Sequence, residues 1–358
     1  MKTQNLPVSI YTGKWRGGHI QGIAVDKEKN YVYCSFTTEF VKLDMKGNLI
    51  GSVKGFTGHL GCLAYNAEDG RVYGSLEYKN DVIGKGILNR LGIENEIQNA
   101  FYIAIFDVDK INRPDMNAAT DGVMTTVWLR EPTEDYLAKW SENGAEKEHR
   151  FGCSGIDGVT FAPAFEGEGM RLLVAYGVYG DIKRTDNDYQ VLLSYRPEEL
   201  KPYEDILSAD HIHTSGPAAC DERYFVYTGN TTFGIQNLEY DAFTGDIFVS
   251  VYRGKKDRFP NFNMFVINGN EPPVETVLLG CGTRGKVLSL KKEGLCENGI
   301  YGYHFKYGAT GMLSLGDGMF YFSEDRGENG VYESDICLYR FTGREKLFEK
   351  VCESVSEK

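Results

Sequence analysis

Three side chains able to act as acids, bases or metal ligands stand near the starts of similar segments, and the two histidines among them occupy equivalent places. His19 and His59 open HIQGIAVD and HLGCLAYN, and Asp157 lies in GIDGVTFA. Imidazole titrates near neutral pH and binds divalent metals, and a carboxylate can serve as a general base. We predict that Asp157, His19 and His59 are catalytic groups or metal ligands. The alternative is structural: the histidines bond backbone carbonyls and the aspartate stabilises a turn.

Charged and aromatic loops supply a second set of candidates. YRGKKDRF contains Arg253 and DIKRTD contains Arg184, and arginine can bind phosphate or carboxylate through two parallel hydrogen bonds. A solvated surface is the alternative. The predicted ligand-binding residues are Gln21, Gln236, Arg184, Arg253, Tyr252, Glu77 and Glu324. Walls for a sugar ring or a base could come from Tyr179, Tyr252, Phe259 and Phe262.

Two further arrangements could carry chemistry. Glu77, Asp157 and Glu324 could converge as the acid and base of a glycosidase. His211 and His213 would point to one side of a strand and form a metal pair, although SADHIHTSG is more typical of an irregular loop.

All these residues belong to a unit that recurs five times. Each unit starts with a similar segment: HIQGIAVD, HLGCLAYN, GIDGVTFA, GIQNLEYD and GATGMLSL. A second apolar run follows a short polar turn, as in YVYCSF and RVYGSL, and a third follows a variable loop, as in FVKLD and QVLLSYR. Weaker fourth runs are LIGSV, VMTTVWL, RYFVYTG, VETVLL and KLFEKV. Strand, turn, strand, loop, strand, strand is one four-stranded antiparallel blade.

Alignment of the first strands gives two columns. One holds large apolar residues: Ile23, Leu63, Val159, Leu238 and Met312. The other is mostly small: Ala24, Ala64, Thr160, Glu239 and Leu313. Such alternation suits sheets packed face to face around an axis. Glu239 is unusual in its column, so we expect its carboxylate to have a partner such as an arginine or a buried water.

The predicted fold is therefore all-β, a five-bladed β-propeller of four-stranded antiparallel blades. A six-bladed propeller is the alternative, and a pair of β-sandwiches would not explain five copies of one unit. We expect a single domain over residues 1–358 with a partly helical insertion around 77–150. Within the insertion, EPTEDYLAKWSENG is predicted to be a short helix. In a propeller, loops entering the first strands and loops joining the second to the third strands surround the same channel mouth.

Composition limits the classes of function. A net charge of −12 argues against a broad nucleic-acid-binding surface. MKTQNLPVSIYTGKW lacks the apolar core of a signal peptide, and no apolar run is long enough for a membrane span. Eight scattered cysteines without a CxxC pair indicate free, mostly buried thiols. We expect a cytoplasmic protein with no nucleic-acid or membrane partner.

The segment GIAVDKEKNYVYCSF resembles an NHL-type propeller strand pair. The whole chain is similar to the five-bladed propellers, which include calcium-activated nucleotidases of the apyrase type and several glycoside hydrolase families. Apyrase-type propellers hold calcium with acidic and hydroxyl groups near the starts of the inner strands. The matching column here has one carboxylate, which argues against a tightly bound calcium ion. It reads Gln21, Gly61, Asp157, Gln236 and Thr310.

The expected function is binding of a small anionic ligand, phosphorylated or sugar-like, at the mouth of the central channel. The sequence leaves open whether the protein is an enzyme; a hydrolase is the reaction class expected if it is. A divalent metal in the channel is the candidate cofactor. The alternative is a non-catalytic scaffold that holds a protein partner. A deep pocket with convergent polar groups favours ligand binding, and a shallow apolar patch favours the scaffold.

Overall fold

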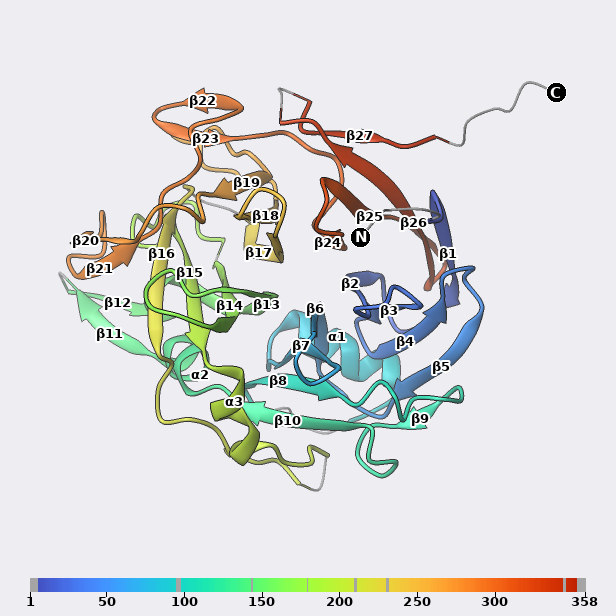
Figure 1. Ribbon diagram of the computed structural model, residues 1–358. Coiled ribbons are helices and arrows are strands. Elements are labelled where there is room, and N and C mark those ends of the chain that lie inside the picture. The colour runs from blue at the N-terminus through green and yellow to red at the C-terminus, as the bar shows by residue number, and fades with distance from the viewer. Residues whose placement is uncertain are drawn as a thin grey trace.

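The five predicted first strands are the innermost strands of five antiparallel sheets arranged around one axis (Figure 1). The computed structural model describes residues 6–94, 98–142, 144–178, 180–208, 211–229, 232–343 and 346–352. The inner strands are β2 (Ile20–Val25), β6 (His59–Asn66), β13 (Cys153–Pro163), β17 (Thr232–Asp241) and β24 (Met312–Ser314). The five-bladed propeller predicted from the repeat is confirmed, and the six-bladed alternative is wrong.

The first two blades follow the predicted plan of four antiparallel strands. Blade 1 continues from β2 through β3 (Tyr31–Phe36), β4 (Glu39–Asp44) and β5 (Leu49–Lys54), with β9 (Met116–Asn117) parallel to β5. Blade 2 continues from β6 through β7 (Arg71–Tyr78), β8 (Ala100–Phe106) and β10 (Met124–Trp128).

Blades 3 and 4 differ from the plan in their outer strands. Blade 3 contains β13, β14 (Met170–Val178), β15 (Tyr189–Tyr195), β16 (Glu222–Tyr227), β21 (Arg284–Val287) and β20 (Val274–Val277). Blade 4 has three described strands: β17, β18 (Asp246–Tyr252) and β19 (Met264–Ile267). VETVLL was predicted to be the fourth strand of blade 4, which is wrong. It forms β20, which joins blade 3 because its hairpin partner β21 pairs in parallel with β16.

Blade 5 is closed by a strand from the other end of the chain. It contains β24, β25 (Met319–Glu328) and β26 (Val331–Phe341), and β1 (Ser9–Trp15) pairs antiparallel with β26. The predicted run KLFEKV forms β27 (Phe348–Lys350), which pairs with the end of β26. The first and last strands of the propeller are thus held in one sheet, which closes the ring.

Two helices and a hairpin interrupt the repeat, one helix within blade 2 and the rest between blades 2 and 3. Helix α1 (Val82–Leu91), which the repeat pattern does not predict, begins after the N-cap Asp81 and ends at Gly92 in the left-handed region. Helix α2 (Arg130–Leu137) begins where predicted but is shorter. The segment assigned to its second half forms the hairpin β11 (Lys139–Glu142) and β12 (Ala145–Glu148). A short helix α3 (Pro197–Leu200) and a hairpin of β22 (Leu295–Glu297) with β23 (Ile300–Gly302) lie at the periphery.

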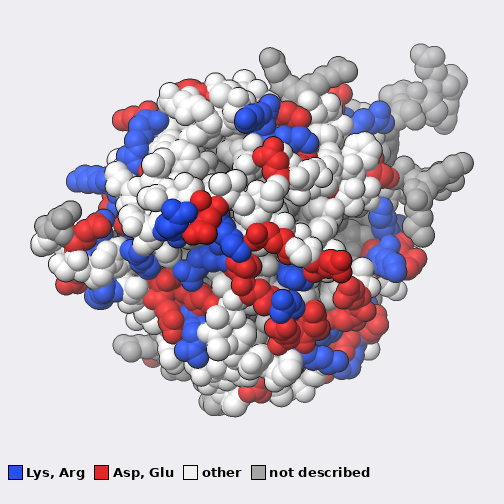
Figure 2. All heavy atoms as spheres, turned by 60° about the vertical axis from the view of Figure 1, so that its left-hand side comes forward, with Lys and Arg blue, Asp and Glu red and all other residues white. Residues whose placement is uncertain are grey.

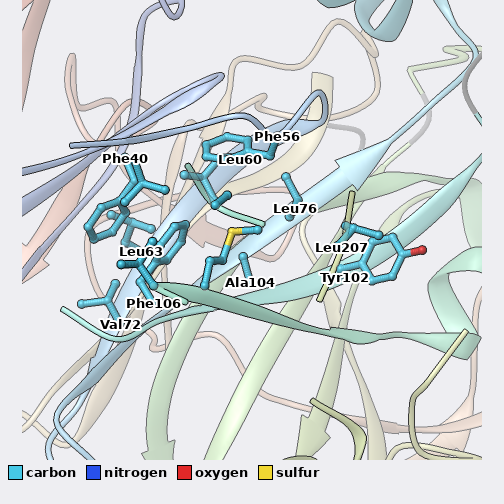
Figure 3. Close-up of a cluster of buried hydrophobic side chains, with 14 of the residues drawn as sticks. Phe40, Phe56, Leu60, Leu63, Val72, Leu76, Tyr102, Ala104, Phe106 and Leu207 are labelled. Atoms are coloured by element: carbon cyan, nitrogen blue, oxygen red, sulfur yellow. The ribbon is translucent and has the colours of Figure 1, made fainter. Parts of the chain in front are cut away.

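The hydrophobic core consists of layers between neighbouring blades. Figure 3 shows the layer between blades 1 and 2, where Phe40 stacks on Phe106 with ring centroids 4.1 Å apart. The large first-strand column (Ile23, Leu63, Val159, Leu238 and Met312) is almost completely buried, as the predicted alternation requires.

The axis is closed by hydrogen bonds that link all five blades. Asn237 of blade 4, which is 0% exposed, donates from Nδ2 to Gln21 O of blade 1 (2.8 Å) and Ala309 O of blade 5 (3.2 Å). Its Oδ1 lies 3.4 Å from Cys62 Sγ of blade 2, and the same sulfur lies 3.4 Å from Val159 O of blade 3. Because Asn237 directly follows the mouth residue Gln236, this ring of bonds lies just beneath the channel mouth.

The surface carries charges of both signs. Figure 2 shows acidic and basic side chains interspersed on one face, without an extended basic area. The eight cysteines are all free thiols, four of them buried. None of the helices in the described residues has the length and apolar character needed to cross a membrane.

Candidate functional site

A polar pocket lies at the channel mouth, where inner strands begin and second strands end. It has a volume of about 330 Å³. Seven predicted site residues line it: His19, Gln21, His59, Glu77, Asp157, Gln236 and Tyr252. Strand register explains part of this convergence, since His59 at the start of β6 is paired with Glu77 near the end of β7.

Three side chains from blades 2 and 3 face one another at the floor of this pocket. His59 Nδ1 lies 3.6 Å from Glu77 Oε1 and 3.6 Å from Asp157 Oδ1. One potential ligand atom from each residue lies within 4.8 Å of the others. We call these three residues the floor triad. Within the described ranges, no other set of three or more His, Cys, Asp and Glu side chains is grouped in this way.

Glu77 is the most firmly held member of the floor triad. Its side chain is 3% exposed, accepts a hydrogen bond from Ile156 N (3.1 Å) and pairs with Lys79 Nζ at 2.7 Å. Burial raises the pKa of Glu77, although the Lys79 charge opposes this. Burial lowers the pKa of Lys79, but the carboxylates of Glu77, Asp157 and Asp81 raise it overall, so Lys79 is a cation at neutral pH.

Glycine at position 155 makes room for this ion pair. A Cβ atom there would lie 2.0 Å from Glu77 Oε2 and 3.2 Å from Lys79 Nζ. The backbone φ of Gly155 is +138°, which side-chain-bearing residues rarely adopt. Gly155 occupies the repeat position that His19 and His59 occupy in blades 1 and 2, and the buried Glu77 carboxylate requires glycine there.

Asp157 has one satisfied and one open oxygen. Its Oδ2 accepts from Gln236 Nε2 at 3.1 Å, whereas Oδ1 is buried without a hydrogen-bond partner in the described part of the chain. Burial, followed by the Glu77 charge, raises the pKa of Asp157 well above its usual range. Lys79 and Gln236 act in the opposite direction without cancelling the effect.

His59 is neutral and also has an open atom. Burial, with added repulsion from Lys79 and His19, lowers the pKa of His59 to about 3. Its Nδ1 has no hydrogen-bond partner among the described residues. Two open polar atoms, His59 Nδ1 and Asp157 Oδ1, therefore face each other in a buried site, where unsatisfied polar groups are costly.

The floor triad fits a divalent metal ion in ligand type and spacing. Tetrahedral coordination with bonds of about 2.0–2.2 Å places neighbouring ligand atoms roughly 3.3–3.6 Å apart. The two 3.6 Å separations from His59 Nδ1 agree with this. One nitrogen and two carboxylate oxygens are a ligand set used for Zn²⁺ and related ions, with a fourth position left for water or substrate. Lys79 compensates only one of the two carboxylates, so ionised Glu77 and Asp157 leave one buried negative charge for a cation to balance.

The rim of the pocket combines hydrogen-bonding and apolar groups. Gln21 Nε2 donates to His19 Nε2 (3.1 Å), and the Tyr252 hydroxyl lies 3.4 Å from the same nitrogen. Since an amide N–H can only donate, the neutral His19 ring carries its proton on Nδ1. Phe233 forms an apolar wall and has a φ of +62°. A bulky residue held in this region signals a strained rim, which is common at binding sites.

Several predicted residues lie away from this pocket. Arg184 pairs with Asp186 at 2.8 Å and lines a separate surface cavity. Glu324 pairs with Lys350 at 2.6 Å and accepts from Tyr339, so it does not converge with Glu77 and Asp157. Arg253 lies in an adjoining cavity that shares His19 and Tyr252 with the pocket.

The remaining candidates also have structural partners. His211 pairs with Asp205, whereas His213 bonds Thr126, so the two rings do not share a metal position. Phe259 and Phe262 are buried in the core rather than lining the pocket, and Tyr179 lies outside the described residues. The Glu239 carboxylate has a partner, as expected, but that partner is the backbone amide of Ser314 (2.9 Å) rather than an arginine.

The structure adds pocket residues that the sequence did not single out. They are Thr37, Ile83, Arg90, Ser154 and Phe233. Ile83 and Arg90 come from helix α1 in the insertion, for which the repeat gives no template. Thr37 could have been predicted, because it follows the second strand of blade 1, where the loops that surround the channel mouth begin. In the structure its hydroxyl accepts a hydrogen bond from Gln21 Nε2 at 3.2 Å.

Solved structures that are similar to the chain include β-propellers. The apo soluble aldose sugar dehydrogenase from Escherichia coli is 10% identical, with 94% of this chain and 99% of that chain covered and a TM-score of 0.38. The Dos1 propeller is 11% identical, with 88% and 78% covered and a TM-score of 0.32. The Cps50 (Swd1) propeller domain from Myceliophteria thermophila is 8% identical, with 90% and 98% covered and a TM-score of 0.32. No protein-family model and no curated protein sequence matches the chain.

Proposed function

We propose that the protein is a hydrolase of small anionic compounds, phosphorylated or sugar-like, that works with a divalent metal ion on the floor triad. The observation that carries the proposal is the pair of 3.6 Å separations from His59 Nδ1 to Glu77 Oε1 and Asp157 Oδ1. Convergent polar groups in a concave pocket support ligand binding rather than a protein scaffold, for which an exposed apolar patch would be expected.

Each residue of the site then has a role that follows from its contacts. A bound metal ion would polarise a substrate oxygen and lower the pKa of a coordinated water. His59, neutral at pH 7, and Glu77, fixed by Ile156 N and Lys79, would supply ligand atoms. Asp157 would supply its open Oδ1 as the third ligand atom. The proton on His19 Nδ1 would form a hydrogen bond with the leaving group.

The chemistry balances without any further reactant. The water oxygen forms a bond to the electrophilic carbon or phosphorus, and the bond to the leaving oxygen breaks. The attacking water gives up one proton to solvent, and the leaving oxygen would receive one proton from His19 Nδ1, which solvent then restores. The walls at Phe233 and Tyr252 would exclude bulk water from one side of the substrate.

The first test measures metal binding. Chelator-treated protein is titrated with Zn²⁺, Mn²⁺ and Ca²⁺ by isothermal titration calorimetry. We expect one site per chain in the wild type and at least a tenfold loss of affinity in Asp157→Asn and Glu77→Gln. Glu324→Gln is the matched control, because Glu324 lies outside the pocket. Hydrolysis of p-nitrophenyl phosphate and p-nitrophenyl glycosides is then measured with the metal that binds. Metal affinity equal in all four proteins would overturn the proposal.

A further inference from the structure

A second cavity adjoins the pocket and differs from it in charge. Its volume is about 470 Å³, and both cavities include His19 and Tyr252 in their walls. It lies between the loops of blades 4 and 5, and its other polar residues include Arg253, Lys306, Tyr307, Thr310, Asp325 and Tyr332. The shared wall makes the two cavities parts of one elongated depression.

The cations of this cavity are available to a ligand. Arg253 is exposed, and its guanidinium has no hydrogen bond or ion pair to any described residue. Lys306 Nζ lies 4.9 Å from the centre of the Tyr307 ring and bonds the Tyr307 hydroxyl at 3.1 Å, with no carboxylate among its described ion-pair partners. The one carboxylate of the cavity, Asp325, accepts a hydrogen bond from Thr310 at 3.1 Å. The cavity therefore has two cations and one anion, whereas the first pocket balances two carboxylates, Glu77 and Asp157, with two cations, Lys79 and Arg90.

Aromatic rings line the boundary between the first pocket and the second cavity. The Tyr332 ring lies 6.2 Å from the His19 ring, and Tyr252 and Tyr307 contribute further faces. Flat rings that line a polar groove are suited to the faces of a sugar ring, and the free guanidinium beyond them is suited to a phosphate or carboxylate.

We infer that the second cavity is an anion subsite, so that the ligand has two parts: a polar group at the floor triad and a sugar-like ring bearing an anionic group that contacts Arg253 and Lys306. This inference rests on the proposed function and specifies its substrate class. The anionic group can be a phosphate or a carboxylate, because both match the guanidinium.

The test compares matched probes by isothermal titration with the metal-loaded protein. The probes are glucose, glucose 6-phosphate, glucuronate and inorganic phosphate. We expect at least one of the three anionic probes to bind about tenfold more tightly than glucose, and this advantage to shrink as NaCl increases. Arg253→Met should remove the advantage without changing glucose binding. Lys255→Met is the control, because Lys255 is an exposed cation on the same loop that does not line the cavity.

The outcomes separate this inference from the proposed function. Preference for glucose 6-phosphate identifies a phosphate ligand, and preference for glucuronate identifies a carboxylate. If no anionic probe binds more tightly than glucose, or if Arg253→Met keeps the full advantage, the anion subsite is overturned. Metal titration of the same Arg253→Met protein tests the floor triad independently, because Arg253 does not belong to it.

Discussion

His59 Nδ1 and Asp157 Oδ1 face each other across 3.6 Å, and within the described residues neither atom has a hydrogen-bond partner. A neutral imidazole and a carboxylate with a raised pKa thus each present one unpaired polar atom to the other. The arrangement costs free energy because both groups are buried. A bound cation would satisfy both atoms at once.

Asp157→Asn should therefore have opposite effects on stability and on metal binding. Without metal, removing a buried ionisable group should raise the free energy of unfolding at pH 8 by about 1 kcal/mol or more, since Asp157 has a raised pKa. The same substitution should weaken metal binding at least tenfold. Urea unfolding of chelator-treated protein, with and without added metal, measures both. A variant that is less stable without metal would show that Asp157 is a structural residue.

Glu239→Gln should change how stability depends on pH. Burial and the Asp241 charge raise the pKa of Glu239 well above 4.5, so the folded state holds a proton that the unfolded state loses. Stability should fall as pH rises from about 4.5 towards the folded pKa, by up to roughly 1.4 kcal/mol per pH unit for this one group. Glu239→Gln should remove this decline, so that its advantage over the wild type grows with pH.

Unfolding free energies at pH 5, 6, 7 and 8 test this expectation. Glu28→Gln, at an exposed position, is the control and should follow the wild type. An advantage for Glu239→Gln that stays constant with pH would mean that Glu239 does not titrate differently in the folded and unfolded states.

Gly155→Ala should disrupt the site through sterics alone. A methyl group would lie 2.0 Å from Glu77 Oε2, and alanine disfavours a φ of +138°. We expect a loss of more than about 2 kcal/mol in stability together with loss of metal binding. Gly86→Ala is the opposite case, because Gly86 lies within helix α1 with open space around it. It should stabilise by about 0.5–1 kcal/mol. Similar effects of the two substitutions would contradict the assignment of Gly155.

Asn237→Ala should weaken the whole ring of blades. It would leave Gln21 O, Ala309 O and Met312 N without their bonds to the asparagine side chain. Because each buried unpaired group costs about 1–3 kcal/mol, we expect a loss on the order of 3 kcal/mol or more by urea unfolding. Asn270→Ala, at an exposed turn, should cost less than about 0.5 kcal/mol. A small effect at Asn237 would show that water replaces the side chain at the axis.

The propeller could be predicted because its unit repeats. Each inner strand has a large apolar residue at the same position, such as Leu63 or Leu238, and this residue is buried between blades. VETVLL was assigned to the wrong blade because an apolar run does not encode its partner strand. The blade to which β20 belongs depends on the parallel pairing of β21 with β16, which joins residues more than fifty positions apart in the sequence.

The site was predictable where the repeat positions it and not elsewhere. Gln21, Asp157 and Gln236 converge because they occupy one repeat position in three inner strands, and His19 and His59 share the position two residues earlier. Arg184 was predicted as a ligand contact from its charge, but a side chain on a long loop can turn to a local partner, here Asp186. Arg90 and Ile83 were missed because helix α1 belongs to an insertion that has no counterpart in the other blades.

The pairing of β1 with β26 also determines when the protein can be completed during synthesis. Ser9 is paired with Cys337, 328 residues further along the chain, so β1 cannot pair until β26 has been synthesised. Until then the nascent arc has two open edges that could capture strands of other chains. Interruption of synthesis before β26 has been made should therefore favour aggregation of the incomplete ring.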